Sequence, residues 1–238
     1  VSLTPAGGAY AAEVRDGLSR LAAATLSAMA FRGGAGLLHL AILPTFGTRW
    51  LIPRLPRFTE AHPGVTINFS TKLVPFDFAH DAADAAIHFG LPVWPGARLH
   101  RLMGEEVVPV AAPALVARAG LKEAADLLRQ PLLQQSTRPR AWANWLEQQG
   151  LPPERALMGP RFEQFAMVAQ AAVAGLGVAI VPRILVEEEL RSGALVIPVD
   201  RPVRGSEGYY LVYPEAKASL PAVVAFRDWL VGECEGMN

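Results

Sequence analysis

An apolar strand that runs directly into a helix, in residues 36–58, constrains the fold of this chain more than any other segment. Residues 37–43 read LLHLAIL, and after the Pro-Thr-Phe-Gly turn apolar residues recur at helical spacing from Trp50 to Phe58. The first N–H groups of a helix have no partner within the helix, so such a junction can bind an anion. The alternative is an ordinary strand–helix corner that holds no ligand.

Strands and helices alternate after this segment, which indicates a layered α/β fold. We expect strands at residues 65–71, 85–88, 132–135, 178–181 and 209–213, and helices at residues 46–60, 122–128, 140–148, 164–174 and 220–231. Residues 107–111 and 207–213 are expected to cross between two lobes. The predicted fold is a bilobal α/β fold, with residues 35–108 and 212–238 in lobe I and residues 109–211 in lobe II.

A long helix is predicted before the two lobes. Thr4 can cap the helix start and Pro5 suits its first position. One apolar stripe follows at steps of three or four residues: Tyr10, Val14, Leu18, Leu21, Thr25 and Met29. A helix of about 27 residues is roughly 40 Å long, too long to be buried on a small domain. We therefore expect residues 1–34 to be a linker helix used in dimerisation, with a hinge at 32–34; a surface helix packed on its own domain is the alternative.

The composition is that of a globular chain with no basic excess. The 238 residues are 51% hydrophobic and 18% charged, and the formal net charge is zero. A chain that holds a phosphate backbone by itself normally shows a basic face, and this composition indicates none. The single cysteine, Cys234, the absence of a signal segment and the absence of a long apolar run predict a cytoplasmic protein without a membrane span.

The motifs of known catalytic and metal sites are missing from the sequence. The five histidines show no pairing at three or four residues, and neither a P-loop nor a G-x-S-x-G elbow occurs. Gly175-Leu176-Gly177 lacks the third glycine of a dinucleotide fingerprint and is expected to let a helix turn tightly into the next strand. The sequence therefore predicts a protein that is not an enzyme, with no cofactor and no metal.

Several blocks, in order along the whole chain, resemble the effector-binding region of LysR-type transcriptional regulators. The resemblance is to the subgroup that contains the glycine-cleavage operon activator and the β-lactamase regulator. The blocks are LTPAG (3–7), ILPTFGTRWLIPRLPRF (42–58), HPGV (62–65), DAAIHFG (84–90), WPGARL (94–99), AMVAQAAVAGLGVAIVP (166–182), YYLVYP (209–214) and AFRDWL (225–230). Each block is short and largely structural, and their order and spacing together carry the likeness.

The resemblance implies a periplasmic-binding-protein-like fold whose lobes hold a small-molecule effector. Effector binding would shift a homo-oligomer, a dimer or tetramer, and so control transcription. In the family, LTPAG follows an N-terminal winged helix-turn-helix, whereas here only Val1 and Ser2 precede it. We therefore expect DNA binding only through a missing N-terminal domain. An amino acid, a peptide fragment or a small carboxylate would suit the effector. The alternatives are a solute-binding protein of a transport system and an enzyme on the same fold.

The predicted effector site draws on helix starts in both lobes and on a returning strand. Its candidate residues are Thr45, Phe46, Ser136, Thr137, Arg138, Gln164, Phe165 and Tyr210. Arg138 could form a two-pronged pair with a carboxylate, or lie in water at the rim. By the resemblance, Gln164 and Phe165 form a third wall and Tyr210 contacts the ligand, so that Tyr209 faces the other way. Thr45 could contact the ligand or simply cap its helix.

Overall fold

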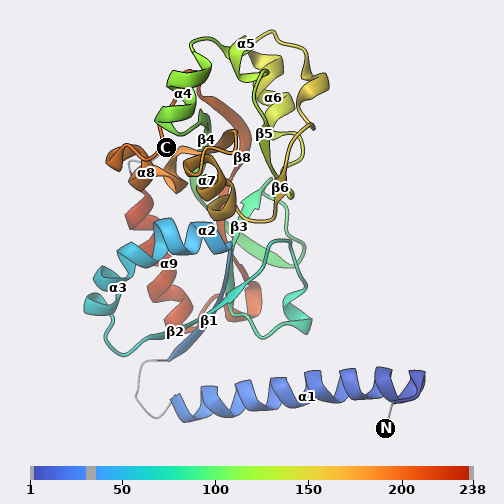
Figure 1. The fold of residues 1–238 in the computed structure, drawn as a ribbon. Coiled ribbons are helices and arrows are strands. Elements are labelled where there is room, and N and C mark those ends of the chain that lie inside the picture. The colour runs from blue at the N-terminus through green and yellow to red at the C-terminus, as the bar shows by residue number, and fades with distance from the viewer. Residues whose placement is uncertain (1–2, 31–35, 236–238) are drawn as a thin grey trace.

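The computed structural model describes residues 3–30 and 36–235. The first element, α1 (Pro5–Ala30), is the predicted long helix, and it lies beside the rest of the molecule as a separate rod (Figure 1). The Thr4 hydroxyl accepts a hydrogen bond from the Gly7 N–H at 3.1 Å, as expected of a cap. The predicted hinge at residues 32–34 lies outside the described residues.

One sheet of eight strands runs through the described part of the chain, in the order β2-β1-β3-β8-β4-β7-β5-β6. The strands are β1 (Leu37–Ile42), β2 (Thr66–Thr71), β3 (Ala85–Gly90), β4 (Ala97–Val110), β5 (Leu132–Gln135), β6 (Arg161–Phe162), β7 (Val178–Pro182) and β8 (Val203–Pro214). Strands β1, β2 and β3 are parallel to one another, as are β5, β6 and β7. The long strands β4 and β8 are antiparallel and join the two parallel groups.

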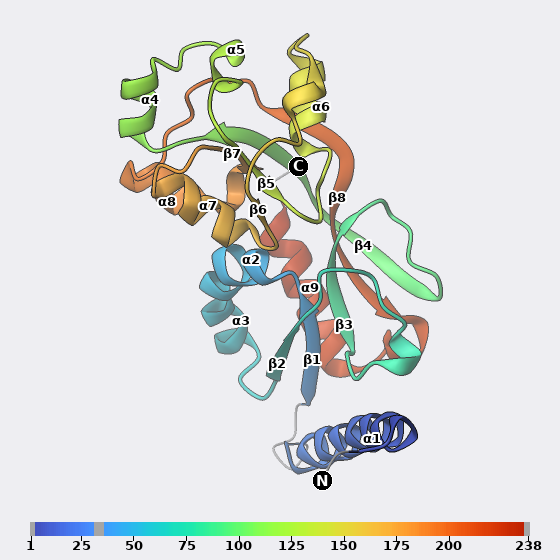
Figure 2. The ribbon, with the colours of Figure 1, turned by 45° about the vertical axis from the view of Figure 1, so that its right-hand side comes forward.

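Helices cover both groups of strands (Figure 2). They are α2 (Pro44–Phe46), α3 (Leu55–Ala61), α4 (Pro113–Ala119), α5 (Ala124–Leu127), α6 (Ala141–Gln148), α7 (Phe165–Val173), α8 (Glu187–Ser192) and α9 (Pro221–Cys234). The single helix predicted at 46–60 is a continuous but irregular run, with a π-helical turn at Gly47–Leu51 and a 3-10 turn at Ile52–Arg54 between α2 and α3. Pro53 and Pro56 have no N–H to donate within the run, which favours such irregular turns.

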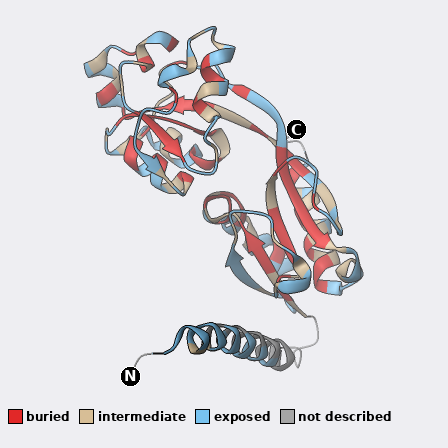
Figure 3. Cartoon of the chain, turned by 90° about the vertical axis from the view of Figure 1, so that its right-hand side faces the viewer, coloured by how far each residue is buried: buried red, intermediate tan, exposed pale blue. Residues whose placement is uncertain are grey.

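The two groups of strands form two lobes (Figure 3), and β4 and β8 cross between them (Figure 2). Gly208 to Val212 of β8 pair with β3 in lobe I, while Val107 to Val110 of β4 pair with β7 in lobe II. The ladder between β4 and β8 shifts register between Gly104 and Glu106, next to this crossing. The bilobal fold predicted from the sequence is therefore confirmed. The predicted lobe limits, 108/109 and 211/212, fall inside these strands and stay predictions.

The hydrophobic core of the described residues has three parts. The largest cluster runs from lobe I into lobe II and includes Phe46, Trp50 and Leu185. A second cluster, in lobe II, surrounds Trp142 and Trp145, whose indole N–H groups donate to backbone carbonyls. The third lies in lobe I and includes Tyr210. Because the largest cluster is shared, the two lobes are packed together along one side.

Candidate functional site

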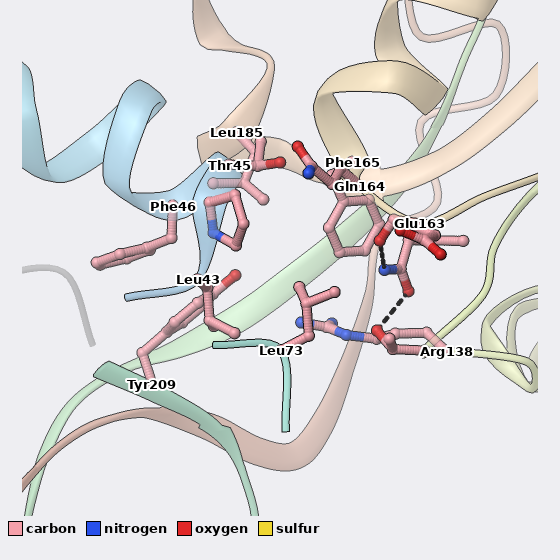
Figure 4. A pocket seen from close by; sticks show the side chains of 13 residues that line it. Leu43, Thr45, Phe46, Leu73, Arg138, Glu163, Gln164, Phe165, Leu185 and Tyr209 are labelled. Atoms are coloured by element: carbon pink, nitrogen blue, oxygen red, sulfur yellow. Dashed lines mark hydrogen bonds between the residues drawn. The ribbon is translucent and has the colours of Figure 1, made fainter. Parts of the chain in front are cut away.

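Two cavities meet at Arg138, between the lobes. The inner cavity, about 40 Å³, has room for only a few water molecules. Figure 4 shows it between α2 and the start of α7, with Arg138 at its edge. The outer cavity, about 500 Å³, lies on the other side of Arg138 and falls within the range of small-molecule sites. The outer cavity is therefore the space in which a small molecule fits.

Thr45 and Phe46 lie in lobe I at the start of the helical run and line the inner cavity. The Thr45 hydroxyl accepts a hydrogen bond from the Ala166 N–H in lobe II, at 3.1 Å. Phe46 is buried and stacks on Trp50 and on Tyr209, with ring centroids 5.0 and 4.6 Å away. Thr45 thus satisfies one of the free N–H groups at the start of α7 from within the chain.

Arg138 lines both cavities and is held by charge and by aromatic rings. Its guanidinium pairs with the carboxylate of Glu105 on β4, a side chain that is 6% exposed. The guanidinium carbon lies 3.5 Å from the ring centroid of Phe89 in lobe I and 5.0 Å from that of Phe165 in lobe II. The other oxygen of Glu105 accepts a hydrogen bond from the Tyr209 hydroxyl at 2.8 Å. These contacts tie both lobes to the crossing strands.

The protonation of this cluster follows from its burial. Burial raises the pKa of Glu105 above its ordinary value, although the charge and hydrogen bond of Arg138 act in the opposite direction. For Arg138, burial opposes the charged form, but the charges and hydrogen bonds of Glu105 and Tyr209 together outweigh burial, and the pKa is raised. Burial, followed by the Glu105 charge, raises the pKa of Tyr209 well above its ordinary value. Arg138 and Tyr209 therefore keep their protons, and Glu105 is the member that can change its charge.

The remaining candidates of lobe II are only partly brought together. Thr137 lines both cavities, and Gln164 and Phe165 line the inner one. Ser136 is exposed and lines neither cavity, since its hydroxyl donates to the Phe162 carbonyl at 3.1 Å. The predicted placement of Ser136 in the same cavity as Thr45 is therefore wrong. A residue can follow a strand at the edge of the sheet next to the cleft and still direct its side chain away from the cleft.

The choice between the two tyrosines of β8 is also corrected. Tyr209 and Tyr210 point to opposite faces of the sheet, as strand alternation requires. Tyr209 lines the inner cavity, whereas Tyr210 is buried in lobe I with Trp94 and Val212. The sequence could predict the alternation, but it gave no signal for which ring faces the cleft.

The outer cavity carries charges of both signs. Besides the pair of Glu105 and Arg138, its wall includes the exposed side chains of Arg140, Asn144 and Glu207. Arg140 also contacts Asn144 at 3.3 Å and Glu147 at 3.5 Å. Glu105, Tyr209 and Glu207 were not among the predicted site residues. Only their positions inside or next to the predicted crossings at 107–111 and 207–213 could have pointed to them.

Comparison with known proteins places this geometry in a family. The sequence model of the LysR substrate binding domain matches residues 31–235. The chain belongs to this family. It is 34% identical, over 97% of its length and 75% of the relative's, to the glycine cleavage system transcriptional activator of Escherichia coli K12. It is 33% identical, over 84% of its length and 69% of the relative's, to the HTH-type transcriptional activator AmpR of Citrobacter koseri.

A solved structure shows the same fold. The effector domain of the transcriptional regulator AmpR of Pseudomonas aeruginosa matches 83% of this chain and 95% of its own, with a TM-score of 0.74 and 29% identity. The predicted resemblance to LysR-type regulators is thus confirmed.

No helix among residues 3–30 and 36–235 has the length and apolar character needed to cross a membrane. Within the same residues, no group of three or more His, Cys, Asp or Glu side chains could hold a metal ion.

Proposed function

We propose that this chain is the effector-sensing region of a LysR-type transcriptional regulator, in which a small molecule bound between the lobes controls transcription. The observation that carries the proposal is the cavity of about 500 Å³ at the crossing of β4 and β8, in a chain of this family. The family match does not favour a solute-binding protein of a transport system. The protein would act in the cytoplasm, where it meets DNA.

The lobes would act as a two-state element. Besides the bond between Thr45 and Ala166, Arg49 beside α2 pairs with Glu189 of α8 at 2.6 Å. An effector that binds one arrangement of the lobes more tightly than the other shifts the equilibrium by its difference in affinity. A homo-oligomer would pass this shift on, and DNA contact would belong to a helix-turn-helix domain, since these 238 residues have no net charge.

An amino acid, a peptide fragment or a small carboxylate fits the charges of the outer cavity. Arg140 can meet a carboxylate and Glu207 an ammonium group, and both lie at its wall. Thr45, Phe46, Thr137, Gln164 and Phe165 would form the inner end of the site.

A thermal-shift screen of amino acids, dipeptides and small carboxylates against the intact chain tests the function, followed by calorimetric titration of each hit. We expect Thr45→Val to weaken binding of the hit by about 0.5–1.5 kcal/mol, because one neutral hydrogen bond between the lobes is lost. Thr59→Val is the control, since the exposed Thr59 hydroxyl donates only to Pro56 of its own helix. Equal affinities of the wild type, Thr45→Val and Thr59→Val would show that Thr45 does not contribute to the site. A screen without any hit would contradict the proposed function.

A further inference from the structure

The donors around Glu105 are those that a bound carboxylate would need. Arg138 offers a guanidinium and Tyr209 a hydroxyl, and between them they hold both oxygens of the Glu105 side chain. Two rings from different lobes, Phe89 and Phe165, pack against the guanidinium. Arginine with a second donor, packed between aromatic rings, is a strong arrangement for binding a carboxylate.

Glu105 reaches this position from an irregular part of its strand. Gly104 pairs with Gly208 and Glu106 with Arg204, so four residues of β8 correspond to two of β4 and the ladder is interrupted at Glu105. Such irregularities aim a side chain away from its regular direction. The same point lies where the chain crosses between the lobes. The Glu105 side chain is therefore attached at the place where opening of the lobes would move it relative to Arg138.

A ligand in the outer cavity can reach the same arginine. Glu105 and Arg138 both line this cavity, and it continues to the exposed Arg140 and Glu207. We propose that Glu105 is an internal stand-in for the carboxylate of the effector: it holds Arg138 in the empty site, and the effector's carboxylate displaces it. This inference rests on the proposed effector-sensing function, and it names both the ligand chemistry and the residue that competes with the ligand.

The exchange is accompanied by uptake of one proton. Three charged or titratable groups face Glu105: Arg138 from the loop after β5, and Tyr209 and Glu207 from β8. Once Arg138 has turned to the effector, Glu105 keeps only the Tyr209 hydroxyl and lies near the like charge of Glu207. Its carboxylate then takes a proton from solvent and becomes a neutral acid. Burial and the Glu207 charge already raise the pKa of Glu105, which makes this proton uptake easier.

Propionate is a suitable probe because it is little more than the end of a glutamate side chain. The intact chain and a Glu105→Gln variant are titrated with sodium propionate at pH 7 while the melting temperature is followed, with sodium chloride at equal ionic strength as reference. Glutamine keeps the shape of Glu105 and removes its charge. We expect the variant to respond at propionate concentrations at least about tenfold lower than the wild type does. Propionamide, which has no carboxylate, should stabilise neither protein.

Two further arms identify the partner and the proton. The double variant Glu105→Gln with Arg138→Gln should not respond to propionate, because it lacks the guanidinium. Its two glutamines carry no net charge, like the Glu105–Arg138 pair of the wild type. The wild-type response should strengthen from pH 8 to pH 6, whereas that of the Glu105→Gln variant should stay constant. If Glu105→Gln does not fold, Glu105→Asp serves in its place. Its shorter side chain cannot hold Arg138 as Glu105 does, so this variant should respond to propionate at several-fold lower concentrations than the wild type; an equal response would count against the inference.

Equal responses of wild type and Glu105→Gln, or a response that survives loss of Arg138, would overturn the inference. Neither result touches the effector screen on the wild-type chain, which tests the function separately. Conversely, a strong propionate response of Glu105→Gln together with an empty screen would leave the carboxylate site standing and contradict the function.

Discussion

Removal of the Arg138 side chain should lower the stability of the folded chain. Its side chain is 17% exposed, and it is the ion-pair partner of the buried Glu105. Arg138→Ala leaves that carboxylate buried without its counter-charge, and breaking such a pair from one side costs about 3–5 kcal/mol of stability. We expect this loss in the free energy of unfolding, measured by urea denaturation at pH 7.

Arg140 provides the matched control for that measurement. It is two residues away in the sequence, its side chain is 72% exposed, and its ion-pair contact with Glu147 is a long one at 3.5 Å. Arg140→Ala should change the free energy of unfolding by less than about 0.5 kcal/mol. Similar losses in the two variants would mean that the pair of Glu105 and Arg138 contributes little to stability.

His88 should make stability depend on pH. Its imidazole lies in β3 and makes a T-shaped contact with Trp94, with ring centroids 5.3 Å apart. Burial lowers the pKa of His88 below its ordinary value, and a hydrogen bond with the Leu91 backbone only partly opposes this. The unfolded chain therefore binds more protons than the folded one just below pH 6.5, and stability falls as the pH drops through that region.

Replacing His88 by glutamine removes this proton linkage. The free energy of unfolding of His88→Gln, measured between pH 7 and pH 5, should decline less steeply than that of the wild type. An unchanged slope would show that His88 is equally easy to protonate in the folded and unfolded chains.

At the residue scale, the sequence could predict which segments meet, but not which side chains face the cleft. Thr45 was predicted from a helix start, Arg138 from its place after a strand, and Phe165 from the family resemblance; all three line the inner cavity. Tyr210 and Ser136 were placed wrongly, because the face of a strand or turn is set by packing on both sides. Glu105 was missed because its partner is 33 residues away in the sequence, a pairing that only the folded chain creates.

At the element scale, the junction between β1 and the helical run depends on a glycine. A Cβ atom added at Gly47 would lie 2.2 Å from the Ile42 Cδ1 atom. The first turns of the run must therefore pack very closely on β1, and this brings Thr45 to the cleft. Gly47→Ala should destabilise the chain by about 1–3 kcal/mol, because overpacking forces side chains and backbone to shift.

The control substitutes a helical glycine with open space around it. Nothing lies within 4 Å of a Cβ added at Gly232 in α9, and the residue is exposed. Gly232→Ala should stabilise by up to about 1 kcal/mol through helix propensity alone. Opposite signs of the two changes in melting temperature support the close approach at Gly47. A neutral Gly47→Ala would show that Ile42 can move aside.

Most elements were predictable because their patterns are local. The strand predicted at 132–135 matches β5, and the helix predicted at 164–174 differs from α7 by one residue at each end. The first part of β4 and the helices α4 and α8 were not predicted. The outer half of β4, RLHRLMGEE, mixes charged and apolar residues and is ordered by pairing with β8, whose paired residues lie 98 to 115 positions later in the sequence.

At the scale of the whole molecule, α1 has an apolar side that the described structure leaves uncovered. Leu18 and Leu21 are 61% and 66% exposed, and Tyr10 is 73% exposed. An amphipathic helix of this length normally buries such a stripe against another element. A second copy of α1 in a homodimer would cover it, in keeping with the dimerisation role predicted for residues 1–34.

Sedimentation of the intact chain against a double variant, Leu18→Glu with Leu21→Glu, tests this role. At micromolar concentration we expect the wild type to sediment as a dimer or larger, well above the 25.5 kDa of one chain. The double variant should shift towards monomer, because each copy would bury two carboxylates between the paired helices. Glu13→Lys is the control: it changes the charge by two units, but Glu13 lies about 100° around the helix from the middle of the stripe. Its assembly should match that of the wild type.

If all three proteins sediment as monomers, α1 does not mediate dimerisation. If the double variant assembles as well as the wild type, the oligomer is held by the lobes instead.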